Sequence, residues 1–347
     1  MTSEVWIGKG ILKEKSFREK LLKLSSRFAL IMDEGVAKLF KEKLFAHGLD
    51  LELFTFPPGE KHKTRETKQA LEDQMLSRRF GRTSALIAMG GGVVTDLGGF
   101  VAATFCRGVP LILIPTTLMG MVDACIGGKT GVNTPHGKNL IGAFYSAQLV
   151  VSDLDCLTSL PAHEVRSGMA EVIKYALTLD PSLLDVKDQE TLVRRSCALK
   201  EEVVGSDFGE DGRRRLINFG HTVGHALERI EEWRMPHGDA VAIGMLIECL
   251  ISVELGYLKK EDFFTALKWV CAYDFPLALS SRVTLESLLS AMAYDKKSSG
   301  PLPSFVLLKK IGEVVPFGGR YCIEVDPKIL EKALQKYAEI IDQTKPA

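Results

Sequence analysis

The sequence predicts an α/β protein in which an N-terminal, Rossmann-like, doubly wound parallel sheet is followed by a mainly α-helical domain. Two observations indicate this fold. Up to about residue 155, short and continuous apolar runs alternate with stretches of helical periodicity, as in a parallel sheet covered on both faces. After Leu160-Pro161, long helical patterns dominate. We therefore expect one domain over residues 1–155 and a second over residues 156–347.

The elements of the first domain follow from these patterns in chain order. We expect strands at 27–33 (RFALIMD), 51–56 (LELFTF), 84–89 (SALIAM), 109–117 (VPLILIPTT) and 148–153 (QLVVSD). Between them, helices are expected at 34–48, where apolar positions recur at helical spacing up to Gly48, at 64–79 and at 93–105. In this arrangement strands and helices alternate along the chain, as the doubly wound fold requires.

The second domain is expected to be largely helical. Helical patterns cover residues 170–177, 189–204, 213–232, the stretch from Ala240, and 263–273, and one late strand is expected near Leu302 in LPSFVLLKKIG. The most apolar stretch, at 240–258, contains Glu248 and Glu254, which are costly in lipid, so we interpret it as a buried core helix.

Composition excludes several classes of protein. The 347 residues are 46% hydrophobic and 25% charged, which is typical of a globular protein. Lys plus Arg and Asp plus Glu both total 44, so no long-range field favours nucleic acid or an anionic membrane as a partner. The seven cysteines form no CxxC pair and the N-terminus has no apolar signal region, so we expect a cytoplasmic protein with reduced thiols.

The first segment with chemical meaning is MGGGVVTDLGGF, from Met89 to Phe100. It follows an apolar strand and opens a helix, so its backbone and the helix N-terminus could hold a diphosphate. The spacing is not GxGxxG, and a tight turn is the alternative interpretation. Thr116 and Thr117 end the next apolar strand at the same edge of the sheet, where ligands bind in open α/β folds.

A second segment, DACIGGKTGVNTPHGKNLIGAF from Asp123 to Phe144, combines five glycines with Lys129 and Lys138 and the amide of Asn139. Flexible backbone with two ammonium groups suits a phosphorylated or carboxylated ligand. The alternative is a glycine-rich surface hairpin with solvated lysines.

The histidines suggest a metal site. His221, His225 and His237 fall within 17 residues, and the first two are four apart on an apolar helix, so they share a face. Glu171 lies inside another apolar helix and needs a partner if it is buried. The acid of HExxH is missing, which excludes that metalloprotease motif, and a satisfied core histidine is the alternative. In the nearby run 213–215, an arginine turned inward would become an anion clamp, whereas outward arginines would form a solvated face.

Several segments together resemble the 3-dehydroquinate synthase family. They are GGGVVTDLGGFVAATFCRG from Gly90, PTTLMGMVDACIGGKTGVNTPHGKNLIGAFY from Pro115, SGMAEVIKYAL from Ser167, NFGHTVGHALE from Asn218 and HGDAVAIGM from His237. The resemblance implies an NAD- and zinc-dependent lyase, with Co²⁺ as a further suitable metal, that acts as a homodimer. Its substrate would be the small molecule 3-deoxy-D-arabino-heptulosonate 7-phosphate and its products 3-dehydroquinate and phosphate, a step of the shikimate pathway to chorismate and the aromatic amino acids.

The resemblance also implies roles for individual residues. The zinc ligands would be Glu171, His221 and His237. The substrate and catalytic contacts would be Asp123, Lys129, Lys138, Asn139, Lys174, Lys200, Arg214, Asn218, His225, one of Lys296 and Lys297, and Arg107, which would reach a phosphate across a dimer interface. The NAD contacts would be Asp33, Glu60, Lys63, Gly92, Val93, Val94, Thr95, Asp96, Thr116, Thr117, Lys129, Lys138, Cys156, Leu157, Thr158 and Ser159.

Two departures from the family pattern concern the cofactor. Thr95 stands where the family usually has glycine, so the diphosphate loop would carry an extra side chain, and Gly35 replaces a common asparagine.

The implied reaction oxidises a substrate hydroxyl transiently, eliminates phosphate, returns the hydride and closes the ring by an intramolecular aldol step. The alternatives are another sugar-phosphate cyclase, a related metal-dependent alcohol dehydrogenase, and a catalytically inactive NAD-binding sensor. A dehydrogenase needs no phosphate clamp, so the joint presence of Lys129, Lys138, Lys200 and Arg214 disfavours that alternative. The presence of Lys200, Arg214, Asn218 and His225 favours the carboxylate-bearing substrate over those of the other cyclases.

Overall fold

The computed structural model describes residues 3–210, 212–293 and 302–344, and the chain divides into two compact units. The N-terminal unit consists of Met1–Val165 and Gln189–Cys197, and the C-terminal unit consists of Arg166–Asp188 and Ala198–Ala347. The chain therefore passes from one unit to the other three times. Among the residues described, none of the helices combines the length and the apolar character that a membrane span requires.

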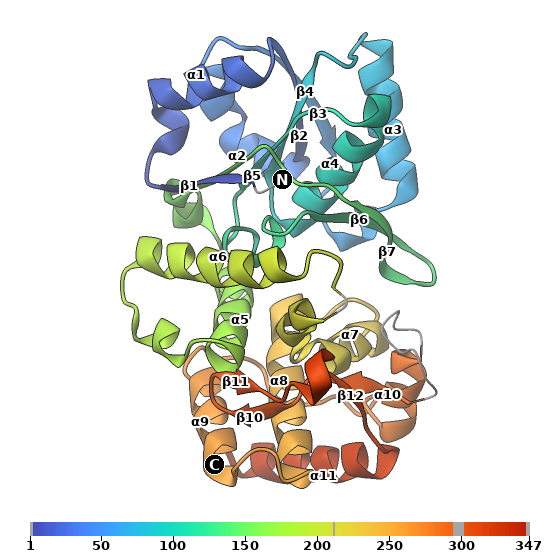
Figure 1. Cartoon of the computed structure of the whole chain (residues 1–347). Coiled ribbons are helices and arrows are strands. Elements are labelled where there is room, and N and C mark those ends of the chain that lie inside the picture. The colour runs from blue at the N-terminus through green and yellow to red at the C-terminus, as the bar shows by residue number, and fades with distance from the viewer. Residues whose placement is uncertain (1–2, 211, 294–301, 345–347) are drawn as a thin grey trace. The chain divides into compact units, whose positions relative to one another are not determined.

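The N-terminal unit is built on a six-stranded parallel sheet (Figure 1). Its strands are β1 (Glu4–Gly8), β2 (Arg27–Asp33), β3 (Asp50–Phe56), β4 (Ala85–Gly90), β5 (Leu111–Pro115) and β8 (Leu149–Asp153), in the order β1-β8-β5-β4-β2-β3. Every neighbouring pair is parallel. All residues of β4, β5 and β8 are buried, which is why these strands are continuous apolar runs in the sequence.

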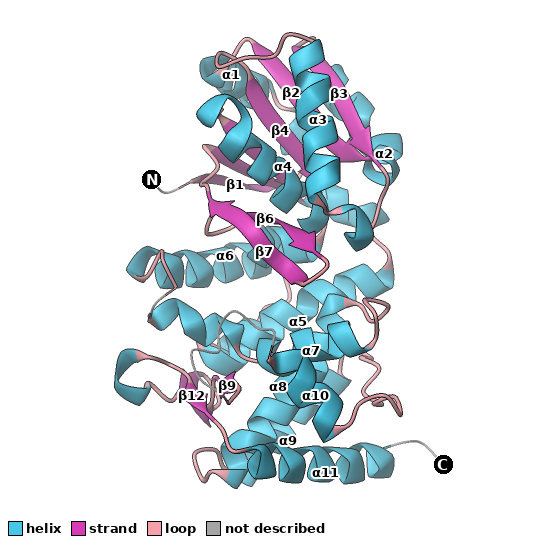
Figure 2. Cartoon of the chain, turned by 90° about the vertical axis from the view of Figure 1, so that its right-hand side faces the viewer, coloured by secondary structure: helices cyan, strands magenta, loops and turns pink. Residues whose placement is uncertain are grey.

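Helices cover both faces of this sheet, as predicted. Figures 1 and 2 place α1 (Lys15–Leu24) and α2 (Glu34–Phe45) on one face, and α3 (Arg65–Ser77) and α4 (Gly92–Thr104) on the other. A hairpin of β6 (Lys129–Thr134) and β7 (Gly137–Phe144) forms a separate two-stranded sheet. The edge strand β1 was not predicted, because only Ile7 of its five residues is buried and no alternation or apolar run marks it.

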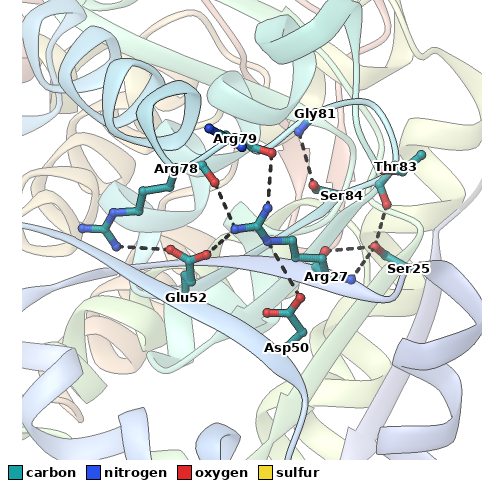
Figure 3. A network of polar contacts seen from close by, with 9 residues as sticks. All are labelled: Ser25, Arg27, Asp50, Glu52, Arg78, Arg79, Gly81, Thr83 and Ser84. Atoms are coloured by element: carbon teal, nitrogen blue, oxygen red, sulfur yellow. Dashed lines mark hydrogen bonds and ion pairs between the residues drawn. The ribbon is translucent and has the colours of Figure 1, made fainter.

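A polar network stabilises the amino-terminal edge of the sheet (Figure 3). The Arg27 guanidinium at the start of β2 forms an ion pair with Glu52 of β3 and donates to the carbonyl oxygens of Arg78 and Arg79, at 3.0 and 3.2 Å. It also stacks over the Phe80 ring at 4.2 Å. The network therefore joins two strands to the chain that follows α3, at the edge opposite to the strand ends where ligands bind in such folds.

The C-terminal unit is mainly helical. It contains most of α5 (Ala162–Thr178), the end of α6 (Gln189–Ser206), and α7 (His221–Ile230), α8 (His237–Glu254), α9 (Lys260–Cys271), α10 (Leu285–Met292) and α11 (Pro327–Thr344). The late strand expected near Leu302 is present as the short β9 (Ser304–Phe305) and β10 (Leu308–Lys310), which pair with β12 (Ile323–Glu324) and β11 (Glu313–Val314). Helix α8 is buried over nearly its whole length, which explains its membrane-like composition.

One predicted helix is broken. The stretch 213–232 consists of a 3₁₀ turn at Arg213–Asn218 followed by α7, because Gly220 has the left-handed backbone conformation (φ +79°). The break makes His221 the first residue of α7.

Candidate active site

The C-terminal unit brings Glu171, His221 and His237 together. Glu171 lies in the middle of α5 and is 1% exposed, while each histidine is the first residue of its helix, α7 and α8. The Nε2 atoms of His221 and His237 both lie 3.6 Å from Oε1 of Glu171. One donor atom from each of the three residues lies within 4.8 Å of the others, which is a geometry that could hold a metal ion.

Close helix packing produces this cluster. A Cβ on Gly244 of α8 would lie 2.0 Å from the Gly220 carbonyl oxygen, so α7 begins directly against the α8 backbone. A Cβ on Gly238 would lie 2.4 Å from Cα of Ser167 in α5, and the Gly238 N–H donates to Ser167 Oγ at 3.0 Å. Glycine at these positions therefore lets the three helices approach closely enough for their first or central residues to converge.

Each ligand candidate is held by a further contact. His237 Nδ1 lies 3.2 Å from Oε2 of Glu228, which is 1% exposed, and His221 Nδ1 lies 3.1 Å from the Phe219 carbonyl oxygen. The Lys174 ammonium, one helical turn from Glu171, forms an ion pair with its carboxylate. Both histidines thus turn Nε2 toward Glu171 and keep Nδ1 for a supporting hydrogen bond, as metal-binding histidines commonly do.

The charges around His237 change its protonation. In the metal-free protein burial lowers the pKa of His237, but the carboxylates of Glu228 and Glu171 outweigh burial and raise it to about 10. A metal ion at Nε2 must displace this proton.

Glu228 was not predicted as a site residue. Its position in the quoted segment NFGHTVGHALE, three residues after His225, was the available signal, but the sequence does not reveal that it faces His237.

A second group of residues could also hold a metal ion, since donor atoms of His225, Glu228 and His237 lie within 4.8 Å of one another. The His225 ring lies 5.4 Å from that of His221, centroid to centroid, which confirms that these two histidines share a helix face.

Buried cations and an amide accompany the cluster in the same unit. Lys174, Lys200 and Arg214 are 1%, 5% and 0% exposed. Of the three consecutive arginines, only Arg214 is buried, and its Nη1 donates to the Phe208 carbonyl oxygen at 2.9 Å. Asn218 Nδ2 donates to Glu210 Oε1 at 2.7 Å. The inward arginine, rather than a fully solvated basic face, is therefore the observed arrangement.

The residues expected to contact NAD lie in the N-terminal unit, mostly where parallel strands end. Asp33 ends β2 and caps α2, accepting from the Val36 N–H at 2.9 Å. Glu60 and Lys63 follow β3, and Thr116 and Thr117 follow β5. Gly92, Val93, Val94, Thr95 and Asp96 form the start of α4 after β4, and Cys156, Leu157, Thr158 and Ser159 lie in a 3₁₀ helix after β8. The topology thus gathers these residues at the carboxyl edge of the sheet.

The extra side chain at position 95 is turned inward. Thr95 is 2% exposed, and its Oγ1 donates to the carbonyl oxygens of Gly91 and Gly92, both at 3.3 Å. The Thr95 side chain therefore adds no bulk to the surface of the loop before α4, as a glycine at this position would not.

The β6–β7 hairpin carries the other predicted substrate residues of this unit. Lys129 begins β6 and is exposed, whereas Lys138 in β7 is half-buried, with Nζ 3.7 Å from Oε1 of Glu60. Asp123 lies in a π-helical turn at Gly120–Ala124 that precedes the hairpin. The segment is a hairpin, as the alternative interpretation held, but its β7 residues are bonded to the turn after β3 instead of being fully solvated.

The remaining predicted residues are Arg107 and one of Lys296 and Lys297. Arg107 is exposed in a tight turn after α4, where Cys106 and Arg107 both have positive φ, +50° and +69°. Such backbone conformations are strained in residues other than glycine and often mark functional positions. Lys296 and Lys297 lie outside the described residues.

Comparison with known proteins gives matches over nearly the whole chain. The family described as 3-dehydroquinate synthase N-terminal matches residues 53–167, and 3-dehydroquinate synthase C-terminal matches residues 168–298. The 3-dehydroquinate synthase of Nostoc punctiforme is 41% identical over 334 residues, covering 90% of this chain and 91% of that protein. The enzyme of Halorhodospira halophila is 39% identical over 328 residues, covering 90% and 92%.

A solved structure with the same fold is the 2-epi-5-epi-valiolone synthase of Streptomyces hygroscopicus subsp. jinggangensis, with NAD⁺ and Zn²⁺ bound. It is 28% identical to this chain, with a TM-score of 0.87 and coverage of 98% of both chains. The predicted α/β fold with a helical C-terminal part is confirmed by this match and by the observed topology.

Proposed function

Because this chain belongs to the 3-dehydroquinate synthase family, we propose that it converts 3-deoxy-D-arabino-heptulosonate 7-phosphate into 3-dehydroquinate and phosphate. The observation that carries the proposal is the convergence of Glu171, His221 and His237 in a unit that also buries Lys174, Lys200 and Arg214. The reaction removes phosphate and closes a carbocycle with no net oxidation, so NAD takes part without being consumed.

The donor set supports zinc dependence. Two imidazoles and one carboxylate are typical ligands of catalytic Zn²⁺, and Co²⁺ accepts the same donors. The residues that hold the metal in this proposal are Glu171, His221 and His237. The Nδ1 atoms of both histidines already have other partners, so Nε2 is the atom left for the metal. When bound, the metal supplies Lewis acidity toward substrate hydroxyl oxygens.

The sheet edge supports NAD dependence. In the proposal, the domain of residues 1–155 binds NAD at the start of α4 and at the ends of β2, β3 and β5, while residues 156–347 form the metal- and substrate-binding domain. The N-terminus of α4 presents backbone N–H groups and a favourable dipole to a diphosphate. When bound, NAD would supply reversible hydride-transfer chemistry.

The chain's own cations bind and orient the substrate. We assign Lys129, Lys138, Lys200 and Arg214 to its carboxylate and phosphate. Lys200 and Arg214 are buried and Lys138 is half-buried, and such cations bind anionic groups strongly when water is excluded, while Lys129 adds an exposed positive charge at the start of β6. Asn139 and Asp123 contact hydroxyl groups in this proposal. His225, whose ring lies 5.4 Å from that of His221, moves protons to and from the substrate. Because these residues hold the substrate in a single orientation, much of the rate enhancement comes from positioning.

We also propose a homodimer in which Arg107 contacts the phosphate of the partner's substrate. The exposed and strained turn that presents Arg107 supports this role. Mixed dimers of Arg107→Ala and Lys129→Ala chains should recover activity, because one site then has an intact arginine and an intact lysine. Verified mixed dimers with no recovery contradict the contact across the interface.

One assay tests the main proposal. The purified protein, Zn²⁺ and NAD are incubated with the heptulosonate phosphate, and phosphate, 3-dehydroquinate and NADH absorbance are followed together. We expect equal amounts of both products and no accumulation of NADH. Turnover of sedoheptulose 7-phosphate or glucose 6-phosphate in place of the heptulosonate indicates another sugar-phosphate cyclase, and stoichiometric NADH formation indicates a dehydrogenase.

Metal analysis tests the ligand set separately. We expect about one zinc per chain in the native protein and little in His237→Ala. The matched control is His163→Ala. His163 lies at the start of α5, the helix that carries Glu171, but its side chain is exposed. Equal zinc content in the native protein and in His237→Ala contradicts the assignment.

A further inference from the structure

The β6–β7 hairpin contains an irregularity at the residues expected to bind substrate. Val132 pairs with Ile141 and Thr134 pairs with Gly137, so a single residue of β6, Asn133, lies opposite the stretch 138–140 of β7. Within that bulge Asn139 has a left-handed backbone conformation, with φ +52°. Asparagine tolerates this conformation better than most residues, but the bulge still needs contacts that fix it.

Asn133 supplies contacts on both sides of its amide. Its Oδ1 accepts from the backbone N–H of Asn139 at 3.0 Å, and its Nδ2 donates to Oε1 of Glu60 at 2.7 Å. Its own backbone N–H donates to the Lys63 carbonyl oxygen at 2.8 Å. One side chain therefore joins the bulge of the hairpin to the turn after β3.

Lys63 strengthens the same connection. Its ammonium is nearly buried, with the residue 3% exposed, and it lies 2.5 Å from Oδ2 of Asp96 and 2.7 Å from Oδ1 of Asn139. Asn139 is thus held through its backbone by Asn133 and through its side chain by Lys63. A charge-assisted contact of this kind is stronger than one between neutral groups.

The network joins residues that are expected to bind different ligands. Glu60, Lys63 and Asp96 are assigned to NAD and Asn139 is assigned to the substrate, while Lys138 is expected to contact both. We propose that Asn133 is a positioning residue that fixes the bulge at Lys138 and Asn139 and the carboxylate of Glu60 in one arrangement before either ligand binds. This inference rests on the proposed function for the identity of the two ligands.

Two substitutions of Asn133 distinguish the role of its amide oxygen, which accepts from Asn139, from the role of its amide nitrogen, which donates to Glu60. Asn133→Ala removes both contacts, so the Kd for NAD and the KM for the heptulosonate phosphate should each rise about tenfold, with kcat changed less than threefold. Asn133→Asp keeps an acceptor for the Asn139 N–H but places a carboxylate against Glu60. For this variant we expect the Kd for NAD to rise at least as much as in Asn133→Ala, with the KM for the substrate close to that of the native protein.

Thr134→Ala is the matched control. Thr134 is the next residue of β6, and its hydroxyl bonds to Gly137 and His136 at the tip of the hairpin, not to the bulge or the turn after β3. We expect its Kd for NAD and its KM to stay within twofold of the native values. Equal effects of Thr134→Ala and Asn133→Ala show a general loss of hairpin structure and overturn the proposal.

A measurement without ligands keeps the proposal independent of the reaction. Hydrogen exchange of the hairpin segment 134–142 in the free protein should be faster in Asn133→Ala and nearly unchanged in Asn133→Asp. Unchanged exchange in Asn133→Ala overturns the proposal, even if catalysis is impaired. Native protein that forms no 3-dehydroquinate refutes the proposed function instead, and the exchange result still decides the positioning role.

Discussion

Replacing Glu228 by glutamine tests how the metal cluster is held. The change keeps the size of a side chain that is 1% exposed but removes the charge that faces Nδ1 of His237 at 3.2 Å. With a metal ion at Nε2, Nδ1 would keep its proton and donate a hydrogen bond to the carboxylate. A hydrogen bond to a charged group contributes about 1.5 to 3 kcal/mol and one to a neutral amide about 0.5 to 1.5 kcal/mol, so removing the charge should cost about 1 to 1.5 kcal/mol, roughly 5- to 12-fold in affinity. Losses of 10- to 100-fold are typical for such supporting residues.

The assay is competition for Zn²⁺ between the metal-free protein and a chelator, together with the absorption spectrum of the Co²⁺-loaded protein. We expect weaker Zn²⁺ binding by Glu228→Gln and a changed Co²⁺ spectrum, because Nδ1 of His237 then donates to a neutral amide, which makes the imidazole a weaker ligand. Glu231→Gln is the matched control, since it removes the same charge at the end of α7 from a residue whose carboxylate accepts from Ser280.

Two results would refute this reasoning. If Glu228→Gln binds Zn²⁺ within twofold of the native protein, the carboxylate does not support the ligand. If Glu228→Gln loses the metal completely while Glu171→Gln keeps it, the ion lies in the other candidate group, formed by His225, Glu228 and His237.

Three further predictions concern other parts of the structure. Burial raises the pKa of the Cys156 thiol to about 12, so iodoacetamide at pH 8 should label exposed Cys271 and leave Cys156 unlabelled. Mass spectrometry measures the labelling, and fast labelling of Cys156 contradicts its burial. Because the metal-free protein keeps the His237 proton up to about pH 10, Zn²⁺ affinity should rise roughly tenfold per pH unit from pH 6.5 to 8, and a flat profile contradicts this. Gly238→Ala should lower the free energy of unfolding in urea by about 1 to 3 kcal/mol, because its Cβ would overlap the α5 backbone. Gly205→Ala is the control, since its Cβ would meet no atom within 4 Å, and an equal loss in both variants would refute the packing argument.

The fold could be predicted where burial leaves a strong pattern. The strands β4, β5 and β8 are buried on both faces and are continuous apolar runs, and α8 covers most of the helical pattern expected from Ala240. The edge strand β1 gives no comparable pattern, because its residues are partly exposed and it is defined by its partner β8. The break before α7 depends on the backbone conformation of Gly220, and a glycine within an apolar helical pattern does not by itself indicate one.

The candidate site was predictable as a set of residue types but not as a set of contacts. The spacing of His221 and His225 places both on one face, and this is a local property of a helix. The approach of Glu171 to His237 is tertiary, because it depends on how α5 packs against the start of α8 at Gly238. The role of Glu228 and the bond between Asn133 and Glu60 are tertiary for the same reason.

The path of the chain limits how this protein can be divided. The N-terminal unit is completed by Gln189–Cys197, whose Arg194 bonds to the Ile7 carbonyl oxygen of β1 and whose Cys197 donates to the Met121 carbonyl oxygen at 3.1 Å. A gene cut after Val165 would therefore encode an incomplete sheet unit and leave its missing piece attached to the other half. Recombination between relatives at such a point would exchange parts of both units at once, so this architecture favours inheritance as one piece over modular exchange.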